Sequence, residues 1–279
     1  MRRACDHFGG SACGADKMNG GKAITDSVGC AYERDPAVFT LACRVAFIGS
    51  VATTIYFCRS MGGGMEMPCG WTMSMTWMRM PGQSWTISAI LFLLMWLAMM
   101  VAMMLPSALP TFLKTRRRWH SLCFLASGYF VVWLAAGVGV YLPGIVLAAV
   151  AMQSNLVSHA IPWLLGASLI AAGTFQLTRW KMVHLLRCRS PFGCAAASPR
   201  DEASFWLGCK QGVSCCFCCA PPMTMLLAFG MMNPPVIIVV AMVIAAEKLL
   251  TRPAMVARLV GISSIIAGAF VVWLQLRNR

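Results

Sequence analysis

The chain has 279 residues, of which 59% are hydrophobic and only 11% are charged, and its formal net charge is +14. Roughly a quarter of the residues in a soluble domain are charged, so this composition excludes a single globular core surrounded by water. The basic residues cluster between long apolar runs, which favours the loops of a membrane protein over nucleic-acid binding. The composition therefore predicts an all-α, polytopic transmembrane helical bundle in a lipid bilayer, with no nucleic-acid partner.

The apolar runs divide the chain into a tail and a membrane domain. Residues 1–37 are polar and Gly-rich, and are predicted to form a disordered cytoplasmic tail. Residues 38–279 are predicted to form a transmembrane helical domain of about seven spans, within a range of six to eight. The spans are expected near 38–57, 87–105, 121–143 and beyond, 161–176, 212–232, 236–246 and 256–276. The second is expected to stop at Pro106 and Pro110, and an extra span at 143–160 would invert everything after it.

The distribution of Lys and Arg predicts the orientation. If the N-terminus is cytoplasmic, the basic segments face inward. The outer side then holds only Arg59, Arg79, Arg277 and Arg279. The sequence thus predicts a multi-pass protein of the bacterial inner membrane, with a cytoplasmic N-terminus and a periplasmic or extracellular C-terminus. A Met-rich loop at 58–86 would lie outside and a basic loop at 178–210 inside.

The predicted outer loop is rich in thioethers, with seven methionines between positions 61 and 80. A thioether is a soft, neutral ligand that suits copper(I) better than zinc or magnesium. The alternative is that these methionines are adaptable apolar side chains at the membrane interface. The candidate metal ligands are Met65, Met67, Met73, Met75 and Met78.

A second group of methionines lies on the second predicted span. Met95, Met99 and Met103 recur every four residues and share one helical face, and Met100 and Met104 form the adjacent row. A ladder of this kind offers a route for copper(I) along the helix. Ordinary helix packing explains the same pattern and is the favoured interpretation.

Four cysteines occupy five positions in the fifth predicted span, namely Cys215, Cys216, Cys218 and Cys219. At helical spacing, thiols three and four residues apart lie over one turn. Such a cluster can chelate a soft ion or form a redox pair, whereas isolated buried cysteines act as small hydrophobic residues. All four are candidate metal ligands.

The predicted inner basic loop adds two further candidates. His184 and Cys188 are four residues apart, share a face if the stretch is helical, and would complete a mixed His/Cys site with the cysteines of the fifth span. A solvated histidine is the alternative. Near the end of the sixth span, Glu247 is interpreted as an interfacial ion pair with the adjacent Lys248, or alternatively as a proton carrier.

Several motifs occur together along the chain: residues 70–78, 99–110, 172–178 and 188–191, Cys215 with Cys218 and Cys219, residues 231–233, and Glu247-Lys248. This combination resembles a bacterial family of predicted metal-binding integral membrane proteins of unknown function. The resemblance covers about residues 60–250 and implies a helical membrane fold and metal binding. Two positions depart from the family pattern, which usually has Cys where His184 stands and Pro where Arg179 stands.

Three functions remain open from the sequence. The first is a membrane protein that binds or moves a soft metal such as copper(I), captured by the outer methionines, held by the inner cysteines and supplied by a metal-donor protein. The second is a membrane thiol oxidoreductase or metalloenzyme subunit that uses the same cysteines. The third is a scaffold or assembly subunit among other membrane subunits. Phosphate-binding, metalloprotease and serine-nucleophile motifs are absent from the sequence, which argues against common enzyme classes.

Overall fold

The structure, a computed structural model, describes residues 35–61, 64–66, 72–74, 77, 84–114, 119–189 and 201–277. The predicted disorder of the tail therefore concerns residues almost all of which lie outside the described part. The same holds for three of the candidate methionine ligands, Met67, Met75 and Met78.

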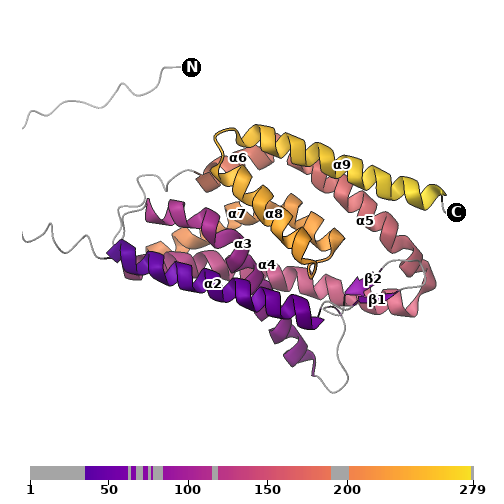
Figure 1. Cartoon of the computed structure of the whole chain (residues 1–279), viewed down its shortest axis with the longest axis horizontal. Helices are drawn as coiled ribbons and strands as arrows, with labels where there is room; N and C mark the ends of the chain where they lie inside the picture. Colours follow the sequence, from indigo (N-terminus) through magenta and orange to yellow (C-terminus); the bar gives the residue numbers. More distant parts are fainter. Residues whose placement is uncertain are drawn as a thin grey trace, which may run out of the picture. The chain divides into compact units, whose positions relative to one another are not determined.

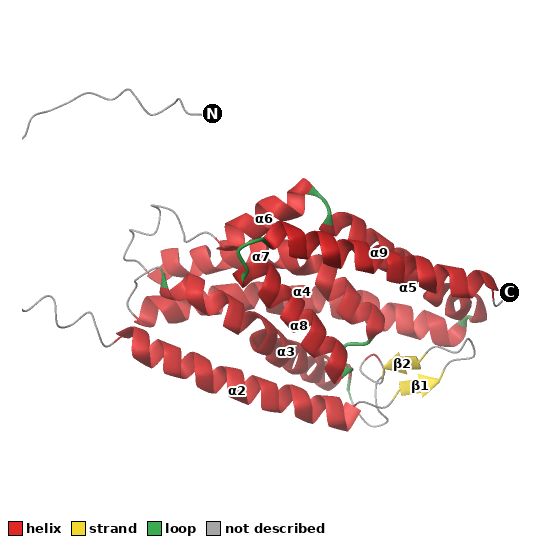
Figure 2. Ribbon diagram, turned by 45° about the horizontal axis from the view of Figure 1, so that its top comes forward, coloured by secondary structure: helices red, strands yellow, loops and turns green. Residues whose placement is uncertain are grey.

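The described chain is almost entirely helical, which confirms the predicted all-α bundle. In chain order its elements are α2 (Asp35–Met61), β1 (Gly64–Glu66), β2 (Thr72–Ser74), α3 (Trp85–Leu113), α4 (Trp119–Gln153), α5 (Asn155–Gln176), α6 (Arg179–Arg189), α7 (Asp201–Phe229), α8 (Pro234–Leu249) and α9 (Pro253–Arg277) (Figure 1). The two short strands pair antiparallel as a small hairpin between α2 and α3 (Figure 2).

Six of the described helices are long and apolar enough to cross a membrane, namely α2, α3, α4, α5, α7 and α9. This number is the lower end of the expected range. The remaining predicted span, 236–246, is helix α8, which has 16 residues. At about 1.5 Å per residue, α8 is roughly 24 Å long, somewhat short of the ~30 Å hydrocarbon core of a bilayer.

Proline does not end the helices where the sequence pattern suggested. Helix α3 continues through Pro106 and Pro110 to Leu113, so the predicted stop was wrong. Ending a helix leaves four carbonyl groups without partners, whereas an internal proline removes a single donor, so continuing costs less in apolar surroundings. Helix α4 likewise continues through Pro143, and α5 begins just after Ser154. Residues 143–160 therefore form no separate helix.

The basic stretch 178–210, predicted as a loop, is helical at both of its ends. Residues 179–189 form α6, and α7 begins at Asp201 rather than near 212. The polar composition of α6 lacks apolar periodicity, so the sequence did not predict a helix here. Three of its side chains, Lys181, Leu185 and Cys188, are nevertheless buried against the rest of the bundle. Tertiary packing therefore stabilises a helix that the hydrophobic pattern of this stretch does not predict.

Glycines set the closest helix contacts. A methyl group at Gly173 would lie 2.6 Å from the carbonyl oxygen of Gly261, and one at Gly268 would lie 2.7 Å from that of Gly166. These two pairs hold the antiparallel helices α5 and α9 together, because the backbones can approach only where side chains are missing. The pair runs side by side in Figure 1.

The interior of the bundle is rich in sulfur-containing and aromatic side chains, which pack among aliphatic ones. The methionine row of α3 is buried there, together with Trp96 and Tyr129. The indole Nε1 of Trp96 donates to the carbonyl oxygen of Trp133 at 2.9 Å, which ties α3 to α4. The same interior contains Cys215, Cys218 and Cys219 of α7.

Candidate metal centre

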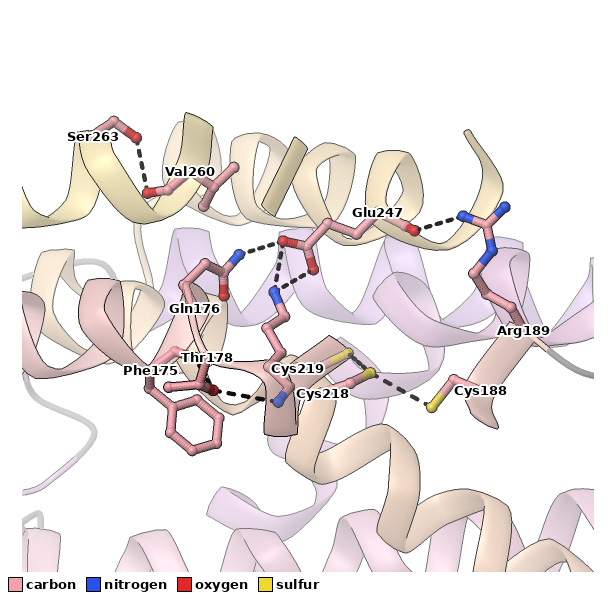
Figure 3. A network of polar contacts seen from close by, with 11 residues as sticks. Phe175, Gln176, Thr178, Cys188, Arg189, Cys218, Cys219, Glu247, Val260 and Ser263 are labelled. Atoms are coloured by element: carbon pink, nitrogen blue, oxygen red, sulfur yellow. Dashed lines mark hydrogen bonds and ion pairs between the residues drawn. The ribbon is translucent and has the colours of Figure 1, made fainter. Parts of the chain in front are cut away.

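Three buried thiols converge where α6 meets α7. Cys188 comes from α6, and Cys215 and Cys218 come from α7; their three Sγ atoms all lie within 4.8 Å of one another. Cys188 and Cys218 are 3.5 Å apart and face each other in Figure 3. A metal–sulfur bond of about 2.3 Å places the sulfurs of a three-coordinate site about 4 Å apart. The trio therefore has dimensions that fit one soft ion after small adjustments.

Cys219 adds a fourth thiol at the edge of the trio. Its Sγ lies 3.5 Å from that of Cys218 and 3.8 Å from that of Cys215. Cys215 and Cys219 are one helical turn apart, as their spacing predicted. All of these cysteines are free thiols.

The position of Cys188 depends on how α6 is attached. Thr178 caps the start of this helix, where its Oγ1 accepts from the backbone nitrogen of Lys181 at 3.3 Å. At the other end, Gln211 Nε2 donates to the carbonyl oxygen of Cys188 at 3.0 Å, and Arg189 Nη1 donates to the carbonyl oxygen of Glu247, also at 3.0 Å. These bonds connect α6 to α7 and α8.

A buried ion pair makes the strongest link between α6 and α8. Lys181 Nζ lies 2.7 and 2.8 Å from the two carboxylate oxygens of Glu247, and both side chains are almost completely buried. Gln176, at the end of α5, also donates to this carboxylate (Figure 3). The carboxylate of Glu247 on α8 therefore contacts side chains of both α5 and α6. These contacts hold α6 in position.

The expected pairing of Glu247 with Lys248 is wrong. Adjacent residues on a helix point about 100° apart, and Lys248 points towards the thiols instead. Its Nζ lies 3.0 Å from Cys215 Sγ, 3.3 Å from Ser107 Oγ and 3.6 Å from Met104 Sδ. Within the described part of the chain, the salt bridge of Glu247 is with Lys181. An ammonium group therefore stands beside the thiol trio.

Tyr129 completes the polar surroundings of the trio. Its hydroxyl lies 2.9 Å from Cys215 Sγ, and the residue is fully buried on α4. Sequence reasoning missed Tyr129, Ser107 and Lys248 as neighbours of the cysteines. Only Lys248 carried a signal, since it is a charged residue at the end of an apolar run.

Two groups on α6 have shifted acidities. Hydrogen bonding with the Cys215 thiol, together with burial, raises the pKa of Cys188 above its ordinary value. Burial, assisted by the nearby charge of Arg187, lowers the pKa of His184. Cys188 therefore carries its proton at neutral pH in the metal-free protein, and metal binding would release it.

The other predicted ligands lie elsewhere. The ring of His184 packs against those of Trp180 and Phe217, at centroid distances of 4.4 and 5.3 Å. Among the described residues, His184 does not join the group of converging thiols. Cys216 is half-buried on α7. Met65 and Met73 are direct partners in the β1–β2 register.

The fold and the site together define a helical protein whose described residues contain six candidate membrane spans and a buried thiol centre suited to a soft metal. The chain belongs to the PpoB2 family, described as a copper chaperone, whose match covers residues 93–271, well over half of the chain. The matched stretch contains all the cysteines of the centre and Met95 to Met104, but not the Met-rich segment at 58–86. No curated protein and no solved structure matches the chain.

Proposed function

We propose that the chain is an integral membrane protein that binds copper(I) at Cys188, Cys215 and Cys218 and passes it to a copper-dependent partner protein. The convergence of these three buried thiols within 4.8 Å is the observation that carries the proposal. Membership of a copper chaperone family supports copper as the cargo. Thiolates select soft ions such as copper(I), and a chaperone site needs ligands that a partner's ligands can replace.

The six long apolar helices support insertion into a bilayer. Lys210 is the last charged residue of α7 before the cysteines, so the thiols would lie about a turn or more inside the apolar part of this helix. The proposed orientation has basic segments and a cytoplasmic N-terminus on one side, and a periplasmic C-terminus on the other side of a bacterial inner membrane.

The arrangement of the helix ends supports this orientation. In Figure 1, the beginning of α2, helix α6 and the α8–α9 turn lie towards the left, whereas β1, β2 and the end of α9 lie towards the right. Helix α6 and the α8–α9 turn, which carry basic residues, therefore lie towards one end of the helical domain, and the strands β1 and β2 lie towards the other. The thiol centre belongs to the end that carries the basic residues.

Copper analysis of the purified protein tests the proposal. After expression with copper, the wild-type protein should retain a stoichiometric amount of copper. The variant Cys188→Ser/Cys215→Ser/Cys218→Ser should retain almost none, because a hydroxyl group is a hard and weak ligand for copper(I). Elemental analysis of both proteins gives the result directly.

Cys123→Ser is the matched control, since Cys123 is exposed on α4, and its copper content should equal that of the wild type. Equal copper in the triple variant and the wild type would refute the site. Cysteines that cycle between thiol and disulfide in a metal-free wild-type protein would instead favour the oxidoreductase function.

A further inference from the structure

The methionines of α3 are confined to the interior of the bundle. All five, from Met95 to Met104, are at most 3% exposed. The exposed large apolar positions of the same helix are occupied by Trp85, Ile87, Ile90 and Leu94. Leucine would serve equally well for burial, and α3 has leucine at half-buried positions such as Leu93 and Leu97. Five thioethers therefore lie on the inward face of α3, beside the buried side chains of Phe92, Trp96 and Leu105.

The row ends at the thiol centre. Met104 Sδ lies 3.6 Å from Lys248 Nζ, and the same nitrogen lies 3.0 Å from Cys215 Sγ. The ammonium of Lys248 therefore lies between the sulfur of Met104 and that of Cys215. A soft cation at this point would have sulfur ligands on both sides.

The other end of the row approaches the Met-rich segment. One turn before Met95, the ring of Phe92 packs against Trp77 and Tyr141, with centroid distances of 5.5 and 4.7 Å. Trp77 follows strand β2, where Met73 pairs with Met65. The aromatic cluster therefore separates the hairpin from the first buried thioether.

The dimensions suit stepwise movement. Met95 and Met104 are nine residues apart, or about 14 Å along the helix, which is nearly half of a ~30 Å hydrocarbon core. Successive thioethers on one face are about 6 Å apart along the axis. Methionine has three rotatable side-chain bonds, so neighbouring sulfurs can reach towards the same ion.

We propose that Met95, Met99, Met100, Met103 and Met104 form a thioether path along which copper(I) moves between the hairpin side of the protein and Cys215. This inference rests on the proposed function, because the path ends at the copper centre. Because the thioethers are neutral, the path holds a monovalent soft ion without placing anionic ligands in the interior. Lys248 lies at the junction, where its ammonium gives way to the ion at Met104 and remains beside the thiolates.

The rate at which copper reaches the thiols tests the path. Copper(I) in acetonitrile-containing buffer is added to the metal-free protein in detergent, and the loss of alkylatable thiols is followed with time. The variant Met99→Leu/Met103→Leu keeps the side-chain volume but places hydrocarbon around a cation. Its loading rate should fall by at least about tenfold, with the same final copper content.

Met242→Leu is the control, because Met242 is exposed on α8, and its loading rate should match that of the wild type. Equal loading rates in the double variant and the wild type would overturn the path while leaving the thiol centre intact. Failure of the wild type to bind copper at all would refute the proposed function itself.

A binding measurement separates the two ideas further. In a Cys188→Ser/Cys215→Ser/Cys218→Ser background, silver(I) should still bind weakly to the methionine row. The same background with Met99→Leu/Met103→Leu should lose most of this residual binding. Residual silver binding that persists unchanged in the combined variant would contradict the path.

Discussion

Replacing Glu247 with alanine should destabilise the protein by about 3–5 kcal/mol, because it leaves the buried ammonium of Lys181 without its counter-charge. Both partners are almost completely buried, and the carboxylate also accepts from Gln176. The loss should appear as a lower midpoint of thermal unfolding in detergent. It should also loosen α6, so Cys188 should react faster with a thiol-alkylating reagent.

The double variant Lys181→Met/Glu247→Leu is the informative control. It removes both charges and fills the space with hydrocarbon, and such replacements of buried ion pairs are often close to neutral. Its unfolding midpoint should therefore recover most of the loss. If Glu247→Ala unfolds at the wild-type temperature and leaves Cys188 unreactive, the ion pair does not hold α6.

Replacing Lys248 with leucine should weaken copper(I) binding by at least about tenfold. A copper(I) ion with three thiolates carries a net charge of −2, and an ammonium about 4 Å away stabilises each unit of this charge by roughly 4 kcal/mol at an effective dielectric constant of 20. Lys248 Nζ is 3.0 Å from Cys215 Sγ, so this stabilisation disappears with the side chain. Competition with a copper(I) chelator measures the change.

Lys248→Arg keeps the positive charge and should keep most of the affinity. Leucine rather than methionine is the appropriate neutral replacement, because a new thioether would add a ligand. An unchanged dissociation constant in Lys248→Leu would show that the ammonium plays no part in holding copper.

The sequence predicted the helical architecture well because long apolar runs have few other solutions in a chain of this composition. It failed at Pro106 and Pro110, where packing outweighs the local preference of proline. It also missed α6, whose helical face is defined by buried residues such as Lys181 rather than by apolar periodicity. Both failures arise where tertiary contacts override a local pattern.

The candidate site was predictable in part. The spacing of Cys215, Cys218 and Cys219 placed their thiols over one turn of a helix, and the structure agrees. Cys188 was also a candidate, but its position beside Cys218 depends on a buried ion pair between residues 66 positions apart, which no local pattern reveals. The direction of Lys248 follows only once α8 is packed against α3 and α7.

X-ray absorption at the copper K-edge of the loaded wild-type protein tests the central claim most directly, namely that the thiols of α6 and α7 bind copper(I). The edge should show the reduced ion, and the first shell should consist of sulfur at about 2.3 Å. The sulfur shell should be lost in Cys188→Ser/Cys215→Ser/Cys218→Ser. A first shell of nitrogen or oxygen, or an unchanged spectrum in the triple variant, would contradict the claim.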